Sequence, residues 1–157
     1  MKHSFLIFLF FVPIIGSASS CDKINRSSDI NIENSNDEPM QSTKINIKVG
    51  SKTFTATLLD NNSAKAFKVM LPFTINMTEL NGDEKYYDLP KNLPVNSLNP
   101  MTIQNGDLML FGSKTIVLFY KSFKTSYSYT KLGKIDNSSG LSAALGSGNV
   151  TVTIEKE

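Results

Sequence analysis

Two acidic residues followed closely by two tyrosines, at Asp83-Glu84 and Tyr86-Tyr87, are the side chains of this 157-residue sequence whose types and spacing first suggest catalysis. A pair of carboxylates can act as general acid and general base. Adjacent residues of a strand point to opposite faces, however, and acidic residues beside a turn are normally solvated. We therefore expect no catalytic role for the Asp83-Glu84 pair.

Other reactive arrangements lack a necessary partner. The only histidine is His3, near the N-terminus, so no Ser-His pair can form in the rest of the chain. The segment 44–157 has neither cysteine nor histidine, and its carboxylates do not have the spacing of a calcium loop. The sequence thus predicts no catalytic residue, no metal site and no cofactor.

The aromatic run FYKSFKTSYSYTKLGKI, residues 119–135, could be an active-site strand, a ligand-stacking surface or an ordinary strand, and its pattern alone favours the ordinary strand. From Phe123 to Tyr129 aromatic residues and a threonine alternate with lysine and serines, which predicts one half-buried strand continuing to Leu132. Packing in the core is the alternative for half of the aromatic candidates, and it is the expectation for Tyr120 and Phe123. The ligand-binding candidates are Tyr86, Tyr87, Tyr120, Phe123, Tyr127 and Tyr129.

The first 20 residues have the composition of an export signal. A basic residue precedes an apolar run at 5–15, which suits a signal peptide and is shorter than the roughly 20 residues that cross a bilayer. Small residues then lead to Cys21, the only cysteine. Ala18-Ser19-Ser20-Cys21 resembles a bacterial lipobox, with Ala18 in place of the usual leucine. We expect lipidation of Cys21 and anchoring to a membrane of the cell envelope; cleavage nearby with a free thiol is the alternative.

The composition divides the chain into three parts: a signal peptide at 1–20, the lipidated cysteine and a flexible tether at 21–43, and one domain at 44–157. The tether is polar, with isolated apolar residues only, and cannot form a core. The domain has 13 lysines and nine acidic residues, a dispersed excess of positive charge that does not favour a nucleic-acid partner. We expect the lysines to form a solvated face.

Alternating apolar residues, turn signals and prolines predict eight or so strands, two short helices and a proline-rich loop at 89–100. This pattern favours a mainly β, closed barrel, with a β-sandwich as the alternative. The run Ile116–Tyr120 is continuously apolar, so this strand should be buried on both faces. The predicted strands are 45–49, 53–59, 73–80, 85–89, 108–111, 115–120, 123–132 and 150–154, and the helices are 64–70 and 138–145.

The order of these elements, with Gly106–Leu110 opening a hairpin and Leu132-Gly133-Lys134-Ile135 before the second helix, resembles the cyclophilin barrel. The closer resemblance is to the bacterial cyclophilin-like proteins. It covers nearly all of residues 45–157 and implies a closed cyclophilin-like barrel. Because one fold hosts many functions, it implies the fold more firmly than an activity.

Cyclophilins isomerise X-Pro bonds, and the family's cleft holds an arginine, a glutamine, aromatic residues and a histidine. Here the only arginine is Arg26, in the tether, and the family's histidine falls at Tyr129. A lysine does not replace the planar guanidinium. The resemblance therefore implies a groove without the catalytic group. We expect a module that binds a peptide or small ligand, with a weak prolyl isomerase and a structural component that docks onto another protein as alternatives.

Overall fold

The computed structural model describes residues 43–157. The predicted signal peptide, Cys21 and all but the last residue of the predicted tether lie outside the described residues. No helix within residues 43–157 is long and apolar enough to cross a membrane.

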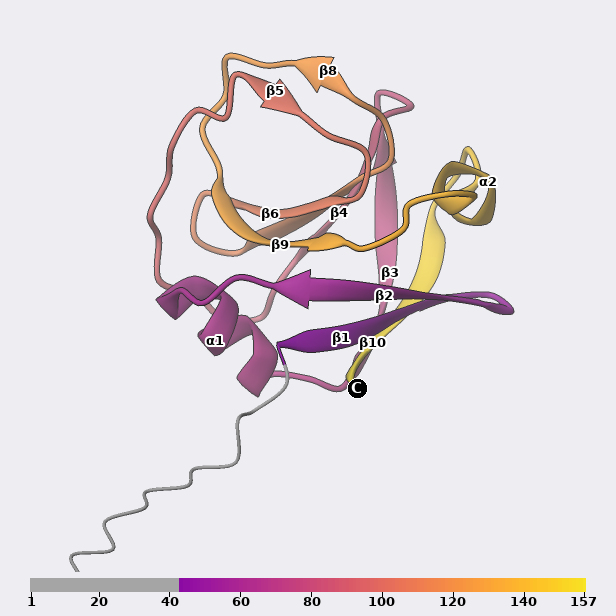
Figure 1. The fold of residues 1–157 in the computed structure, drawn as a ribbon, viewed down its shortest axis with the longest axis horizontal. Helices are drawn as coiled ribbons and strands as arrows, with labels where there is room; N and C mark the ends of the chain where they lie inside the picture. Colours follow the sequence, from indigo (N-terminus) through magenta and orange to yellow (C-terminus); the bar gives the residue numbers. More distant parts are fainter. Residues whose placement is uncertain (1–42) are drawn as a thin grey trace, which may run out of the picture. The chain divides into compact units, whose positions relative to one another are not determined.

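Eight antiparallel strands close into a barrel in the order β1-β10-β3-β4-β7-β6-β9-β2, which is visible in part in Figure 1. The closure confirms the predicted mainly β barrel with two helices and is not the β-sandwich alternative. The barrel strands are β1 (Lys44–Val49), β2 (Lys52–Leu58), β3 (Phe73–Leu80), β4 (Glu84–Asp88), β6 (Asp107–Phe111), β7 (Thr115–Phe119), β9 (Thr130–Ile135) and β10 (Val150–Lys156).

The inward-facing residues of these strands form the main core. Since side chains alternate along a strand, β1 contributes Ile45, Ile47 and Val49, all buried. Two helices add apolar residues to the same core: α1 (Asn62–Val69) contributes Phe67, and α2 (Leu141–Leu145) contributes both of its end leucines. Figure 1 shows the two helices on opposite sides of the barrel strands.

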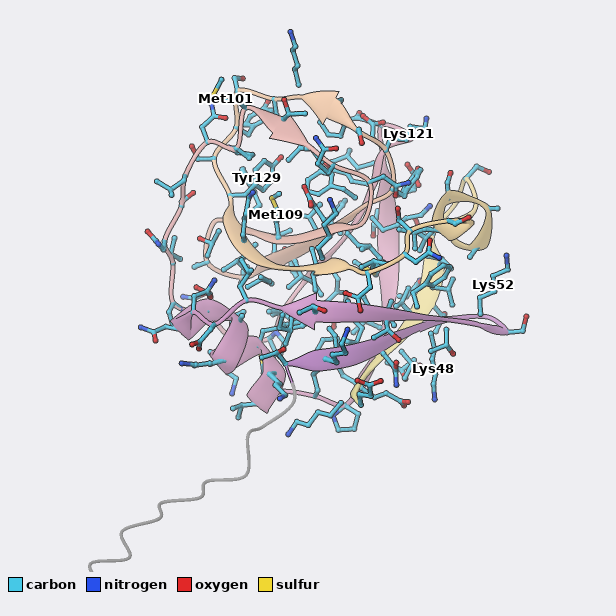
Figure 2. The ribbon with its side chains drawn as sticks, in the orientation of Figure 1. Lys48, Lys52, Met101, Met109, Lys121 and Tyr129 are labelled. Carbon is cyan, nitrogen blue, oxygen red and sulfur yellow. The ribbon has the colours of Figure 1, made fainter. Side chains whose placement is uncertain are left out.

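A second, smaller core lies on the outer face of β6 and β7. Met109, Val117 and Phe119 point outward there and are covered by the chain around β5 (Thr102–Ile103) and β8 (Phe123–Lys124), which pair with each other. Figure 2 shows Met109 and Tyr129 in the space between this pair and the barrel strands. The prediction that the strand at Ile116–Tyr120 is buried on both faces is confirmed, and the β5–β8 pair is the reason.

The strand predicted at 123–132 is wrong. The chain forms the short β8, leaves regular structure at Thr125, and forms β9 only from Thr130. The Thr125 hydroxyl accepts a hydrogen bond from the Tyr127 amide at 3.1 Å, a local bond that replaces a strand ladder. The alternation therefore does not produce one aromatic face: Tyr127 is 64% exposed, whereas Tyr129 is 7% exposed.

The Leu-Gly-Lys-Ile sequence at the end of β9 has a packing reason. A Cβ atom added to Gly133 would lie 2.5 Å from the carbonyl oxygen of Thr57, on the neighbouring β2. Only glycine allows the two backbones to approach this closely. The register between β6 and β9 also shifts here, from Leu108 opposite Gly133 to Met109 opposite Lys131. The motif thus marks a β-bulge at which the barrel strand bends.

Candidate functional site

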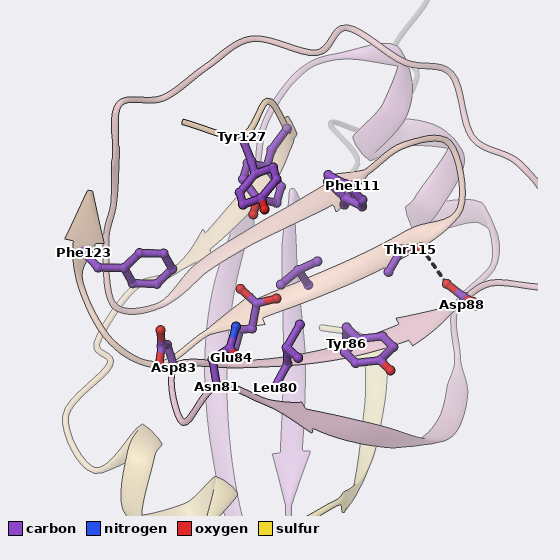
Figure 3. A pocket seen from close by; sticks show the side chains of 12 residues that line it. Leu80, Asn81, Asp83, Glu84, Tyr86, Asp88, Phe111, Thr115, Phe123 and Tyr127 are labelled. Atoms are coloured by element: carbon purple, nitrogen blue, oxygen red, sulfur yellow. Dashed lines mark hydrogen bonds between the residues drawn. The ribbon is translucent and has the colours of Figure 1, made fainter. Parts of the chain in front are cut away.

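A cleft of about 490 Å³ opens on the outer face of the barrel, where the second core meets the turn between β3 and β4 (Figure 3). Its floor consists of β4 and β7, and its walls are aromatic residues from β6 and from the chain between β7 and β9. The residues lining it are Leu80, Asn81, Asp83, Glu84, Tyr86, Asp88, Phe111, Thr115, Val117, Phe123, Tyr127 and Tyr129.

The alternation of β4 places its side chains in the cleft. Glu84, Tyr86 and Asp88 all line it, since residues two apart share one face of a strand. On the neighbouring β7, Thr115 lies opposite Asp88 and donates its hydroxyl hydrogen bond to that carboxylate at 2.6 Å. Asp88 is therefore partly satisfied by a neutral donor at one end of the floor.

The walls are a chain of aromatic rings in contact with one another. Phe111 lies edge-on to Tyr127, with ring centroids 6.2 Å apart, and 5.6 Å from Tyr129. Tyr129 is edge-on to Phe119, which in turn contacts Phe123 at 5.8 Å. Contacts of this kind favour a fixed arrangement of rings, so the walls are largely formed before a ligand arrives.

Glu84 is the acidic residue in the floor with an unusual environment. Within residues 43–157 no cation pairs with its carboxylate and no group donates a hydrogen bond to it. Burial raises the pKa of Glu84 to about 7, with smaller contributions from the negative charges of Asp83 and Glu79. Near neutral pH this carboxyl therefore exchanges between its neutral and charged forms.

The next residue, Lys85, points to the opposite face and is fully buried. Its ammonium pairs with Glu79 and also donates to the carbonyl oxygens of Gly146, at 2.9 Å, and Gly148, at 2.6 Å. Tyr120 donates its hydroxyl to both oxygens of the Glu79 carboxylate at 2.8 Å. The expectation that the lysines form a solvated face is therefore wrong for Lys85, because the chain after α2 supplies buried acceptors for it.

Four of the six aromatic candidates meet in the cleft: Tyr86, Phe123, Tyr127 and Tyr129. The other two do not line it. Tyr87 packs against the main core, and Tyr120 is buried in that core with its hydroxyl on Glu79. Both point to the inner face for the same reason that Lys85 does, namely the alternation of β4 and β7. The expectation of core packing thus holds for Tyr120, whereas Phe123 belongs to both the second core and the cleft wall.

Comparisons with known proteins are consistent with this architecture. The model of the cyclophilin-like family matches residues 47–155. The chain belongs to the cyclophilin-like family. Among solved structures, it is similar to the solution structure of the hypothetical protein AF2241 from Archaeoglobus fulgidus, with a TM-score of 0.53 and 18% identity, over 77% of this chain and 99% of that one. At this identity the likeness shows the fold alone. A search of the curated proteins found no match.

Tyr129 is the residue that the resemblance places where cyclophilins have a histidine in their cleft. Tyr129 does line the cleft, with its ring between Phe111 and Phe119. Burial raises the pKa of Tyr129, and the negative charge of Glu84 acts in the same direction. This hydroxyl therefore stays protonated at neutral pH and is a hydrogen-bond donor rather than a base.

Several cleft residues of the cyclophilin-like domain were not predicted as site residues. Phe111 ends β6 and is partly exposed in the cleft, but in the sequence nothing distinguishes it from the core residues of the same apolar run. Glu84 was predicted to be solvated. It is half-buried because Phe119 lies opposite it on β7 and the β8 segment folds over this face. That cover comes from residues distant in sequence.

Acidic residues in the cleft do not form a metal site. No group of three or more histidine, cysteine, aspartate or glutamate side chains within residues 43–157 is arranged to hold a metal ion. The cleft instead offers aromatic surface, tyrosine hydroxyl groups and the Glu84 carboxyl, which titrates near neutral pH. These groups suit recognition of an organic ligand.

Proposed function

We propose that this cyclophilin-like chain is a ligand-binding module that holds a peptide or a small organic molecule in its outer cleft. The observation that carries the proposal is the combination of a cleft of about 490 Å³, aromatic walls in mutual contact, and a carboxylate without a partner among the described residues. A volume of this size is typical of small-ligand sites. Such sites are usually apolar clefts into which a small number of polar groups point.

Binding is favoured over prolyl isomerisation by the residue types present. No arginine or histidine occurs in residues 43–157, so the cleft has no guanidinium to polarise a prolyl amide. The residue at the family's histidine position is Tyr129, which is buried against other rings. A weak isomerase acting by desolvation alone predicts a rate above the thermal background in a protease-coupled X-Pro assay, whereas the binding module predicts the background rate.

The test of the binding proposal is a ligand screen followed by NMR on the full chain. Small amines, alcohols, acids and short peptides should include compounds that shift the signals of Tyr86, Tyr127 and Tyr129 together. Tyr127→Ala should weaken their binding several-fold without unfolding the chain, because this side chain is 64% exposed. Val69→Ala, an exposed apolar residue on α1, is the matched control and should leave binding unchanged. A broad screen that moves none of the cleft signals contradicts the proposal.

We also propose that the chain acts in the bacterial cell envelope, attached to a membrane through lipidated Cys21. The support is the signal-like composition of residues 1–20 and the lipobox-like sequence that ends at this cysteine. Cys21→Ser should abolish incorporation of radiolabelled fatty acid and move the chain from the detergent phase to the aqueous phase. Unchanged partitioning of Cys21→Ser would contradict the attachment, and it would leave the binding proposal standing.

A further inference from the structure

The charge of the cleft lining is one-sided. Asp83, Glu84 and Asp88 line the cleft, and no lysine is among the lining residues. The nearby Lys121 lines a different hollow, together with Tyr120 and other residues. In a domain with an excess of lysine over acidic residues, this outer cleft is therefore a locally acidic surface.

The three carboxylates are not equivalent. Asp88 accepts a hydrogen bond from the Thr115 hydroxyl, and Asp83 lies in the turn before β4. Glu84 is the one whose pKa burial raises, and Figure 3 shows its carboxylate pointing into the cleft. A buried carboxylate without a cation or donor is costly, and a ligand that supplies the missing positive charge removes that cost.

The walls beside this carboxylate are suited to the same kind of ligand. Aromatic rings attract a cation through their faces and pack against an apolar stem with their remaining surface. Phe111, Tyr127 and Tyr86 all line the cleft that holds Glu84, and the Tyr127 ring is exposed. An anionic ligand would instead meet three negative side chains and no compensating lysine.

We propose that the ligand of this cleft carries an organic cation, an ammonium or guanidinium group on an apolar stem, and that Glu84 pairs with the cation while the aromatic walls contact the stem. The inference rests on the proposed binding function and narrows it to one ligand class. A free amine and a lysine or arginine side chain of a peptide share this chemistry, and the two sources are separated by the choice of probe.

Binding of the cation depends on pH through Glu84. The charged groups that act on it are Asp83 on the turn and Glu79 on β3, with Asp88 at the other end of β4. The tyrosine hydroxyls around it belong to Tyr86, Tyr120, Tyr127 and Tyr129. Burial raises the pKa values of Tyr120 and Tyr129 above the ordinary tyrosine value. Lys121 is the lysine beside the same turn, with its ammonium 3.8 Å from the position that a Cβ atom on Gly82 would take. Affinity for an ammonium should therefore rise between pH 5.5 and 8 as the Glu84 carboxyl loses its proton.

The experiment compares matched probes on the full chain by calorimetry or NMR titration. The free-amine pair is 4-phenylbutylamine and its neutral analogue 4-phenylbutanol; the peptide pair is N-acetyl-lysine methylamide and N-acetyl-norleucine methylamide. In at least one pair the cation should bind about tenfold or more tightly than its neutral analogue at pH 8. Glu84→Gln should abolish this preference and its pH dependence, so that the cation and its neutral analogue bind equally. The matched control is Glu155→Gln, which removes a β10 carboxylate that pairs with Lys48 on β1. This variant should behave as the unsubstituted chain.

Each other outcome decides against the inference in a recognisable way. Equal binding of cation and neutral analogue in both pairs, at the cleft signals, overturns the cationic ligand and leaves the binding function intact. Loss of preference in Glu155→Gln as well as Glu84→Gln shows a general charge effect and also overturns it. Absence of binding by all four probes overturns the ligand class, and the broader screen then decides whether the cleft binds anything.

Discussion

Glu84 and Lys85 are neighbours on β4, and their environments are opposite. Lys85 points inward, is fully buried, and has Glu79 and two backbone carbonyls as acceptors. Glu84 points outward into the cleft and has no partner within residues 43–157. The charge of Lys85 is compensated by groups of the fold itself, whereas the charge of Glu84 has no compensating group among the described residues. The difference is the reason why we interpret Lys85 as a structural charge and propose Glu84 as a ligand-binding one.

The compensation of Lys85 is complete by count. An ammonium has three hydrogens to donate, and this one has three acceptors, on Glu79, Gly146 and Gly148. Its nitrogen also lies 5.3 Å from the centroid of the Tyr120 ring, on the face that attracts a cation. The cluster therefore connects the segment between α2 and β10 to the barrel strands β3 and β4.

The largest expected effect is on this inner side. Lys85→Met keeps the apolar stem and removes the ammonium, which leaves Glu79 without its cation and two carbonyls without a donor. We expect a loss of about 3–5 kcal/mol in the free energy of unfolding, measured by urea denaturation. Lys48→Met, which breaks a partly exposed pair with Glu155 at 2.6 Å, should cost less than about 1 kcal/mol. Equal costs for the two variants would remove the contrast between Lys85 and an ordinary surface lysine.

A smaller loss is expected when the cluster keeps its ion pair and loses one donor. Tyr120→Phe removes the hydroxyl that donates to both Glu79 oxygens at 2.8 Å. The free energy of unfolding should fall by about 1.5–2 kcal/mol, as for a hydrogen bond to a charged group. Tyr127→Phe removes the hydroxyl of an exposed tyrosine and should change stability by less than about 0.5 kcal/mol. An unchanged free energy of unfolding in Tyr120→Phe would contradict this contribution of the hydroxyl, and would mean that water takes its place beside Glu79.

On the outer side of β4, removing the charge of Glu84 should stabilise the chain rather than destabilise it. The pKa of Glu84 is about 7 in the folded chain against an ordinary 4.5, so the folded state binds more protons between these pH values and stability falls as pH rises from about 4.5 through 7. Because this carboxyl is partly exposed, the loss is about 1 kcal/mol rather than the full value of the shift. Glu84→Gln should therefore be more stable than the unsubstituted chain at pH 8 by about 1 kcal/mol. Glu155→Gln should keep the original pH dependence, and an unchanged slope in Glu84→Gln would contradict the burial of this carboxyl.

The barrel was predictable because its signals are local. Strands such as Ile45–Val49 alternate strictly, and glycine turns such as Gly50 separate them, so period and turn chemistry suffice. The doubly buried strand at Ile116–Tyr120 was predictable from its continuous apolar run. What covers its outer face was not, because β5 has two residues and pairs with β8 across about twenty residues of chain.

The site was predictable only in part. Tyr86 and Tyr129 are candidates that line the cleft, whereas the candidates Tyr87 and Tyr120 face the main core, because which face of a strand is buried depends on the whole barrel. The unpaired state of Glu84 depends on which distant residues fold over it. The Thr125 hydroxyl interrupts a pattern that reads as a strand, and only the position of its neighbours decides between ladder and turn.

The most direct test of the contrast between Lys85 and Glu84 is an NMR titration of the Glu84 carboxyl group. The signal of its carboxyl carbon is followed over pH in the full chain, with and without the cationic probe that binds. We predict a pKa near 7 for Glu84 in the free chain, which falls by about one unit or more when the probe is bound, since a cation favours the charged carboxylate. A pKa near 4.5 in the free chain, or one near 7 that the bound cation does not change, would contradict it.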